Sequence, residues 1–248
     1  EFEEQFFKPS LETRRALLDR FEAGSIEEQD LPRDVLTLLL RNQDRLDLPY
    51  EIVLREVAYF PWVGSHSTSM AFVFTMHEIF GWLAQHPDDW SRVRDRAWLV
   101  QCAHEALRLH PASPEARRVA LADVELTSGE LIPRDADVSL GLATANRDHD
   151  VFGADADAFV PHRALPPDVH PWGLSFGSGA HACMGQELAG GLPADQDTPE
   201  TTHLFGAIVA MAHCLFCHGA RPDPARPPKG DPNTSRPNFG EYWVLLDE

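Results

Sequence analysis

The segment from Phe176 to Gly185 constrains the fold of this chain more than any other part of its sequence. It reads Phe-Gly-Ser-Gly-Ala-His-Ala-Cys-Met-Gly, with glycines on both sides of Cys183. Glycine permits tight turns and lets the backbone approach a flat group closely. A cysteine at the start of a helix lies at the positive end of the helix dipole, which favours the thiolate. The segment therefore predicts a tight loop that presents a thiolate, with a buried structural cysteine as the alternative.

Composition limits the partners of the chain. Its 248 residues suffice for one large core or two small ones. The 39 Asp and Glu against 21 Lys and Arg give a net charge of −18, which argues against nucleic acid and anionic membranes as partners, because both bind basic surfaces. No segment approaches the roughly 20 apolar residues of a membrane span. The four cysteines lack the spacing of a disulfide framework, so we expect a cytoplasmic protein.

Hydrophobic periodicity predicts helices in the first half of the chain. Residues 9–47 read as helical, and a longer helix is expected from about Glu51 to Gln85. A further helix is expected from Trp98 to His110, where Pro111 stops it. The middle of this long helix, residues 63–68, is a patch of poor helix formers. Such a patch predicts a local bulge, a feature that often lies at functional sites.

The second half of the chain has a different residue pattern, richer in turn-forming residues. Alternating residues and turn formers between 117 and 142 predict short strands. A helix that starts near Cys183 is expected to break at residues 190–193 and to resume near Thr201. The pattern as a whole indicates a mainly α protein with small β-sheets. Because no repeat and no clear linker interrupt it, residues 1–248 are expected to form a single domain.

The loop around Cys183 resembles the heme-binding loop of the cytochrome P-450 family, F-x-x-G-x-H-x-C-x-G, and fills every fixed position of that pattern. Two further motifs occur in the family's order. Residues 105–108 match its E-x-x-R helix, and residues 159–163 match its F-x-P-x-R meander. The resemblance covers roughly residues 30–248. It implies a truncated P-450-like fold in which the N-terminal half of the family's fold is missing.

The resemblance also assigns roles to individual residues. It implies heme b as the cofactor, with Cys183 as the ligand of the iron and Phe176 packed near the thiolate, which pushes electron density toward bound oxygen. His181 and Arg118 match positions that contact the heme propionates. The loop glycines complete the cofactor-binding set: Gly177, Gly179 and Gly185. A buried charge network that supports the loop is expected from three residues: Glu105, Arg108 and Arg163.

The long helix departs from the family's A/G-G-x-D/E-T-T signature. The equivalent stretch has His66 in place of the acid and Ser67 in place of the first Thr, followed by Thr68. In the family the acid and the alcohol deliver protons, so these three residues are the candidate catalytic groups. Histidine can act as an acid or a base near neutral pH. The alternative is that His66 is a helix residue with a local hydrogen bond and no catalytic part.

The charge pattern bears on how electrons reach the site. No Lys or Arg occurs from Ala164 to Ala220, whereas several acidic residues do. An acidic redox partner docks on a basic surface, so this segment disfavours such a partner and favours a peroxide-driven reaction. A redox partner protein is still possible through other parts of the surface.

The function that the sequence favours is oxidation of a small organic substrate by a heme-thiolate oxidoreductase. A cytochrome P-450-type monooxygenase or peroxygenase fits this description. The alternatives are a non-redox isomerase or dehydratase and a non-catalytic P-450-like partner protein. An incomplete heme cover would expose an apolar patch, so we expect self-association or a partner chain that completes the pocket. The sequence does not define the substrate.

Residues 213–218, His-Cys-Leu-Phe-Cys-His, contain a second cysteine motif. C-x-x-C-H is the attachment pattern of covalent heme, and the flanking histidines allow zinc as well. The segment also continues a strongly apolar helix, in which cysteines usually serve as small hydrophobic residues. Packing is therefore the favoured interpretation.

Overall fold

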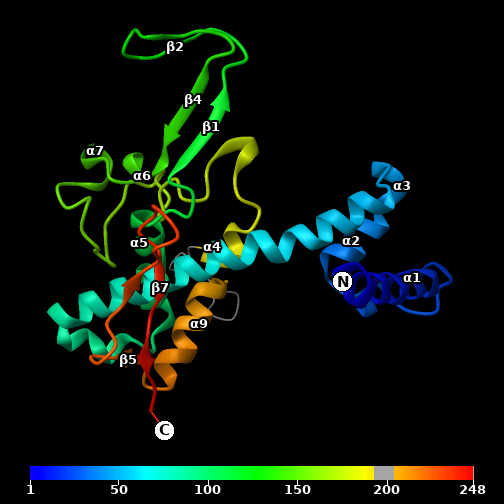
Figure 1. Cartoon of the computed structure of the whole chain (residues 1–248), viewed down its shortest axis with the longest axis horizontal. Coiled ribbons are helices and arrows are strands. Elements are labelled where there is room, and N and C mark those ends of the chain that lie inside the picture. Colours follow the sequence, from blue (N-terminus) through cyan, green and yellow to red (C-terminus); the bar gives the residue numbers. More distant parts are fainter. Residues whose placement is uncertain (193–203, 248) are drawn as a thin grey trace. The chain divides into compact units, whose positions relative to one another are not determined.

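The computed structural model describes residues 1–192 and 204–247. The chain divides into two compact units, Glu1–His66 and Ser67–Glu248, and each is described by itself. The expectation of one domain over residues 1–248 stays a prediction. Figure 1 shows the elements in the order of the chain.

The first unit is helical. Its elements are η1 (Glu3–Phe7), α1 (Lys8–Glu22), η2 (Glu28–Asp30), α2 (Val35–Arg41), α3 (Gln43–Leu46) and the first part of α4 (Tyr50–Gln85). Asp34 caps α2 by accepting a hydrogen bond from the amide of Thr37 at 2.8 Å, and it also pairs with Arg14 at 2.7 Å. The core of this unit is small and apolar, and it comprises Phe7, Leu11, Leu36 and Val53.

The long helix α4 confirms the predicted helix from Glu51 to Gln85, but the predicted bulge was wrong. The backbone stays α-helical from Tyr50 to Gln85 and includes Pro61, whose ring removes one hydrogen bond of the helix. The hydroxyl of Ser65 donates to the carbonyl of Trp62 at 3.2 Å. Such a local bond lets serine remain within a helix, so the poor helix formers do not break it.

The second unit has a helical core formed by α5 (Arg96–Leu109), α8 (Gln186–Gly190), α9 (Gly206–Cys217) and the last turns of α4, with η3 (Pro87–Arg92) between α4 and α5. Helix α5 is buried almost throughout its C-terminal part. It ends just before Pro111, as the sequence predicted. The largest core residues are apolar and include Trp98, Phe80, Ile208 and Phe216. Among the described residues, no helix has both the length and the apolarity that crossing a bilayer requires.

The strands form four small antiparallel pairs within the described residues. β1 (Glu115–Val119) pairs with β4 (Asp137–Gly141), and β2 (Val124–Glu125) pairs with β3 (Leu131–Ile132). Near the C-terminus β5 (Arg221–Pro222) pairs with β8 (Val244–Leu245), and β6 (Lys229–Gly230) pairs with β7 (Phe239–Glu241). Figure 1 shows the β1–β4 ribbon projecting away from α5. These short pairs confirm the prediction of a mainly α protein with small β-sheets.

The segment between β4 and α9 carries the candidate site. Its described residues contain the short helices α6 (Leu142–Ala145), α7 (His149–Phe152) and η4 (Gly179–His181) as well as α8, with turns and irregular segments between them. Helix α8 ends at Gly190, in agreement with the predicted break. The predicted restart near Thr201 lies outside the described residues, and α9 begins at Gly206. The amide of Leu192 donates to the carbonyl of Leu204 at 2.8 Å, so the two ends of the interruption meet.

Candidate functional site

The loop between Phe176 and Gly185 presents an exposed thiol. The backbone amide of Cys183 donates to the carbonyl of Phe176 at 2.7 Å, which closes the loop, and the thiol itself is solvent-exposed and free. Gly177 and Gly179 have φ angles of +69° and +67°, a region that residues with a Cβ adopt only at a cost. The turn therefore requires glycine at positions 177 and 179. Cys183 lies just before α8, which begins at Gln186.

The ring of Phe176 anchors the loop to the core of the second unit. It makes an edge-on contact with Trp172, with ring centroids 5.6 Å apart. A Cβ added at Gly190 would lie 3.1 Å from the Phe176 ring, so the end of α8 approaches that ring closely. Phe176 thus packs its side chain against the core, and its carbonyl oxygen accepts the hydrogen bond from the Cys183 amide.

His104 joins α5 to the end of α8. Its Nε2 donates to the carbonyl of Gly190 at 2.8 Å, and its ring stands edge-on to Trp172 at 4.9 Å. Burial lowers the pKa of His104 to about 4, so the ring is neutral near pH 7. Because a carbonyl only accepts, Nε2 carries the ring proton.

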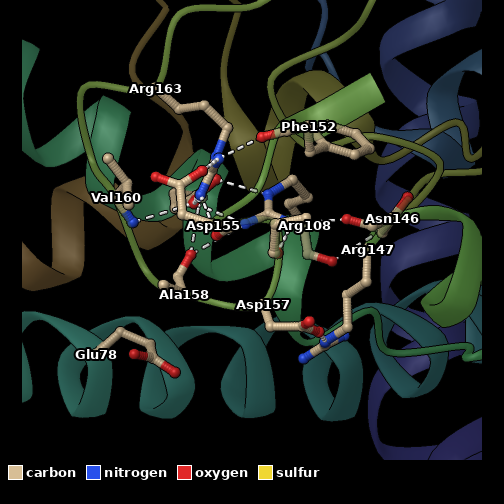
Figure 2. A network of polar contacts seen from close by, with 12 residues as sticks. Glu78, Arg108, Asn146, Arg147, Phe152, Asp155, Asp157, Ala158, Val160 and Arg163 are labelled. Carbon is tan, nitrogen blue, oxygen red and sulfur yellow. Dashed lines mark hydrogen bonds and ion pairs between the residues drawn. The ribbon is translucent and has the colours of Figure 1, made fainter. Parts of the chain in front are cut away.

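A buried charge network lies one turn further along α5. Arg108 binds Glu105 through two hydrogen bonds of 2.7 Å, and Arg163 donates to the same carboxylate at 3.0 Å. The three side chains are 0%, 4% and 6% exposed, in the order Arg108, Glu105, Arg163. The structure thus brings together the residues predicted to form this network. Figure 2 shows Arg108 and Arg163 converging there from different segments.

Backbone carbonyls satisfy the remaining donors of Arg108. It donates to the carbonyls of Asn146, Ala156 and Ala158 at 2.6, 2.7 and 3.2 Å. The Val160 amide donates to Glu105 at 3.1 Å, and Figure 2 shows Val160 and Ala158 on the segment that wraps the network. A buried charge is tolerated only when its donors are matched in this way, so the network fixes the path of this segment.

Asn146 connects this network to the cysteine loop. Its side chain, fully buried, donates to the Arg108 carbonyl and to the Ser175 hydroxyl, each at 2.9 Å, and accepts from the Leu174 amide at 2.7 Å. The Ser175 hydroxyl in turn donates to the Leu107 carbonyl at 2.6 Å. The residue before Phe176 is therefore fixed to the end of α5.

Comparison with known proteins shows which family the chain resembles. The family model named Cytochrome P450 matches residues 76–190, a range that contains the cysteine loop and the charge network. Over these residues the chain is similar to cytochrome P450 proteins.

Curated relatives and solved structures agree with this similarity. The cytochrome P450 monooxygenase fsdH of Fusarium heterosporum is 28% identical over 222 residues, which is 76% of this chain and 38% of that protein. Linalool 8-monooxygenase of Pseudomonas putida is 39% identical over 109 residues, which is 43% of this chain and 25% of that protein. The crystal structure of HmtT, involved in himastatin biosynthesis, has a TM-score of 0.64 and 26% identity, covering 96% of this chain and 53% of that one.

The chain matches only part of the length of its relatives. The chain spans about two fifths of the first curated relatives it matches and about half of the solved structures. The fold of the described residues is that of the matching part of a cytochrome P450, which confirms the predicted fold class.

The residues of the loop fit heme b, the cofactor of cytochrome P450 proteins. A free, exposed thiol is the donor that such a heme iron takes from the protein. A Cβ at Gly185 would lie 3.8 Å from the Cys183 sulfur, so glycine keeps the space beside the thiol clear. Met184 and Leu188 leave 84% and 75% of their surface exposed beside it. Cys183 would hold the iron, with Gly177, Gly179 and Gly185 shaping the loop beneath it.

The predicted propionate contacts lie on separate elements. Arg118 is exposed on β1, where its guanidinium donates to the carbonyl of Arg117 at 2.8 Å, and His181 is exposed in η4. Their roles toward the heme stay predictions.

The predicted catalytic residues all lie in α4. His66 is exposed and ends the first unit, whereas Ser67 and Thr68 are half-buried and begin the second. Their part in proton delivery stays a prediction, as does the alternative of a purely local role for His66.

The remaining cysteines carry no multi-ligand metal centre in the parts of the chain that the structure describes. There, no three or more His, Cys, Asp and Glu side chains gather as metal ligands, which disfavours a four-ligand zinc site at residues 213–218. Cys102 lies in the core, and burial raises the pKa of its thiol well above the usual value.

Several contacts of this site have no signal in the sequence. His104 and Gly190 are 86 residues apart, and nothing in either local pattern indicates that they meet. A second example is Arg96, whose guanidinium lies over the Phe205 ring at 5.6 Å. Phe205 lies in the segment from Ala164 to Ala220, which contains no Lys or Arg. The cation beside it therefore comes from α5, and the sequence pattern does not indicate this contact.

Proposed function

We propose that this chain forms the heme-thiolate part of a monooxygenase that acts on a small organic substrate. The observation that carries the proposal is the exposed Cys183 thiol, which lies in a loop closed by the hydrogen bond from the Cys183 amide to the Phe176 carbonyl. His104 of α5 holds the end of the helix that follows this loop. Such an arrangement offers one soft ligand to an iron.

Each residue of the site has a distinct role toward the cofactor. Heme b, when bound, supplies the activation of dioxygen or peroxide at its iron. Cys183 would donate electron density as the thiolate, and the side chains of Arg118 and His181 would donate hydrogen bonds to carboxylates of the cofactor. The hydroxyls of Ser67 and Thr68 and the imidazole of His66 would hold and move protons.

The names of similar proteins support monooxygenation as the reaction. Linalool 8-monooxygenase and the luteothin monooxygenase of Streptomyces thioluteus are 39% and 35% identical to this chain over their matched parts. We infer a small, mainly apolar substrate and a cytoplasmic location. The oxidant is dioxygen, with two electrons from a redox partner protein, or peroxide, which needs no external electrons.

The exposed apolar residues beside Cys183 support a further part of the proposal. Met184 and Leu188 lie at the site surface, and large exposed apolar residues of this kind are typical of interfaces. We infer that the heme pocket is completed by self-association or by a partner chain. Sedimentation of heme-loaded protein would then report a complex, and a stable monomer with full heme occupancy would contradict this part.

Isotope labelling tests the reaction. Heme-loaded protein is incubated with linalool as the probe, under ¹⁸O₂ with a reductase and NADPH, or with labelled peroxide. The proposal predicts one labelled oxygen atom in the product and none with Cys183→Ser. Unlabelled rearranged product would support an isomerase or dehydratase, and a heme-loaded protein that converts no probe would support the non-catalytic alternative.

A further inference from the structure

We propose that His213 and Cys217, on the last turns of α9, form a two-residue clamp for a thiophilic transition metal such as Zn²⁺. The two residues are one helical turn apart, so their side chains lie on the same face. The Cys217 sulfur lies 3.7 Å from Nε2 and 3.8 Å from Nδ1 of His213. This clamp is separate from the heme site and does not depend on the proposed function.

The distance between the two side chains suits a tetrahedral metal. Zinc binds imidazole nitrogen at about 2.0–2.1 Å and thiolate sulfur at about 2.3 Å. At a tetrahedral angle these bond lengths place nitrogen and sulfur about 3.6 Å apart. The observed 3.7 Å therefore needs almost no movement of the helix. Because both ring nitrogens are nearly equidistant from the sulfur, the imidazole must turn about its Cβ–Cγ bond, a soft torsion, to aim one nitrogen at the metal.

The position on the helix also favours a cation. Helix α9 ends at Cys217, and the carbonyl end of a helix attracts positive charge. The core contacts of α9 are made from a neighbouring face of the helix, by Ile208, Val209, Ala212 and Phe216. Cys217 is exposed and His213 is half-buried, so the pair is not part of that core. Water or a second molecule would fill the remaining positions, since the described residues bring no third ligand there.

The adjacent pair, Cys214 and His218, provides a matched control. It has the same four-residue spacing, with Cys214 on α9 and His218 directly after the end of that helix, and both residues are exposed. The His218 ring, however, lies with Nδ1 2.8 Å from the carbonyl of Cys214, so the backbone already engages it. The geometry therefore separates two pairs that the motif C-x-x-C-H alone does not distinguish.

Cobalt binding tests the clamp, because Co²⁺ bound to thiolate gives a charge-transfer band and Zn²⁺ displaces it. The full chain is titrated in the natural sequence and in a Cys183→Ser background, which excludes the heme ligand as the source of the band. We expect His213→Gln and Cys217→Ser each to weaken binding at least about tenfold. Cys214→Ser and His218→Gln should change it less than about twofold, with helix content by circular dichroism unchanged in all four.

Each other outcome overturns the proposal. Equal loss in Cys214→Ser would assign the metal to the C-x-x-C pair. A band lost only in the Cys183→Ser background would assign it to the loop cysteine. The absence of any band at saturating Co²⁺ would show that the pair binds no such metal.

Discussion

Arg163 and Glu105 lie 58 residues apart in the sequence, yet the Nε of Arg163 donates to the Glu105 carboxylate at 3.0 Å. The same carboxylate accepts two hydrogen bonds from Arg108, its neighbour on α5. One buried anion therefore joins a helix to the segment that wraps it. Through Asn146 the same cluster reaches the residues that precede the cysteine loop.

Removing the central carboxylate should destabilise the protein strongly. Glu105→Ala leaves Arg108 buried without its anion, and breaking such a pair costs about 3–5 kcal/mol. Urea unfolding followed by circular dichroism measures the loss. Glu241 forms an exposed pair with Lys229, so Glu241→Ala is the control and should cost far less than Glu105→Ala. Equal losses in the two variants would refute the central role of Glu105.

Asn146 should couple the network to heme retention. Asn146→Ala leaves the Leu174 amide without its acceptor, which costs about 1–3 kcal/mol, and the Ser175 hydroxyl keeps only its bond to the Leu107 carbonyl. We expect lower stability and faster transfer of heme to apomyoglobin. Asn146→Asp keeps the acceptor for Leu174 and should be milder. Unchanged heme transfer in a destabilised Asn146→Ala protein would disconnect the network from the loop.

Gly177 should matter for the site beyond its effect on stability. Its φ of +69° makes Gly177→Ala cost about 1–2 kcal/mol of backbone strain. Gly129 has a φ of +86° and open space around it, so Gly129→Ala carries a similar strain at the turn between β2 and β3. Both variants should unfold at lower urea concentration, but only Gly177→Ala should lose heme faster. Indistinguishable heme loss would argue that the loop tolerates a different turn.

His104 should make stability depend on pH. Its pKa is about 4 in the folded chain and about 6.5 when unfolded, so the unfolded state binds the extra proton between these values. The stabilisation is complete above pH 6.5 and is lost as the pH falls toward 4. The difference corresponds to about 3 kcal/mol. Unfolding free energies from pH 7 to 4 should show this slope, and His104→Gln should reduce it. A slope equal in both proteins would rule out His104 as its source.

The sequence predicted those parts of the molecule that local patterns control. The apolar period predicted α4, Pro111 marked the end of α5, and the turn formers predicted the short strands. The predicted bulge at residues 63–68 was wrong, because α4 stays α-helical from Tyr50 to Gln85. Propensity in a short patch does not outweigh the rest of a long helix.

The support of the loop depends on contacts that a local pattern does not contain. The bonds of His104 to Gly190 and of Asn146 to Leu174 join distant segments, and each uses a backbone group as its partner. A backbone group leaves no residue preference for a sequence pattern to reveal. The cluster of Glu105, Arg108 and Arg163 could be predicted only through the family resemblance.

The central claim is that Cys183 binds heme iron as a thiolate. The most direct measurement is the carbon monoxide difference spectrum of the reduced, heme-loaded protein, recorded beside a Cys183→Ser control. We predict a strongly red-shifted Soret band in the natural sequence and its loss in the control. A band that is the same in both proteins, or heme-loaded protein without a red-shifted band, would contradict the claim.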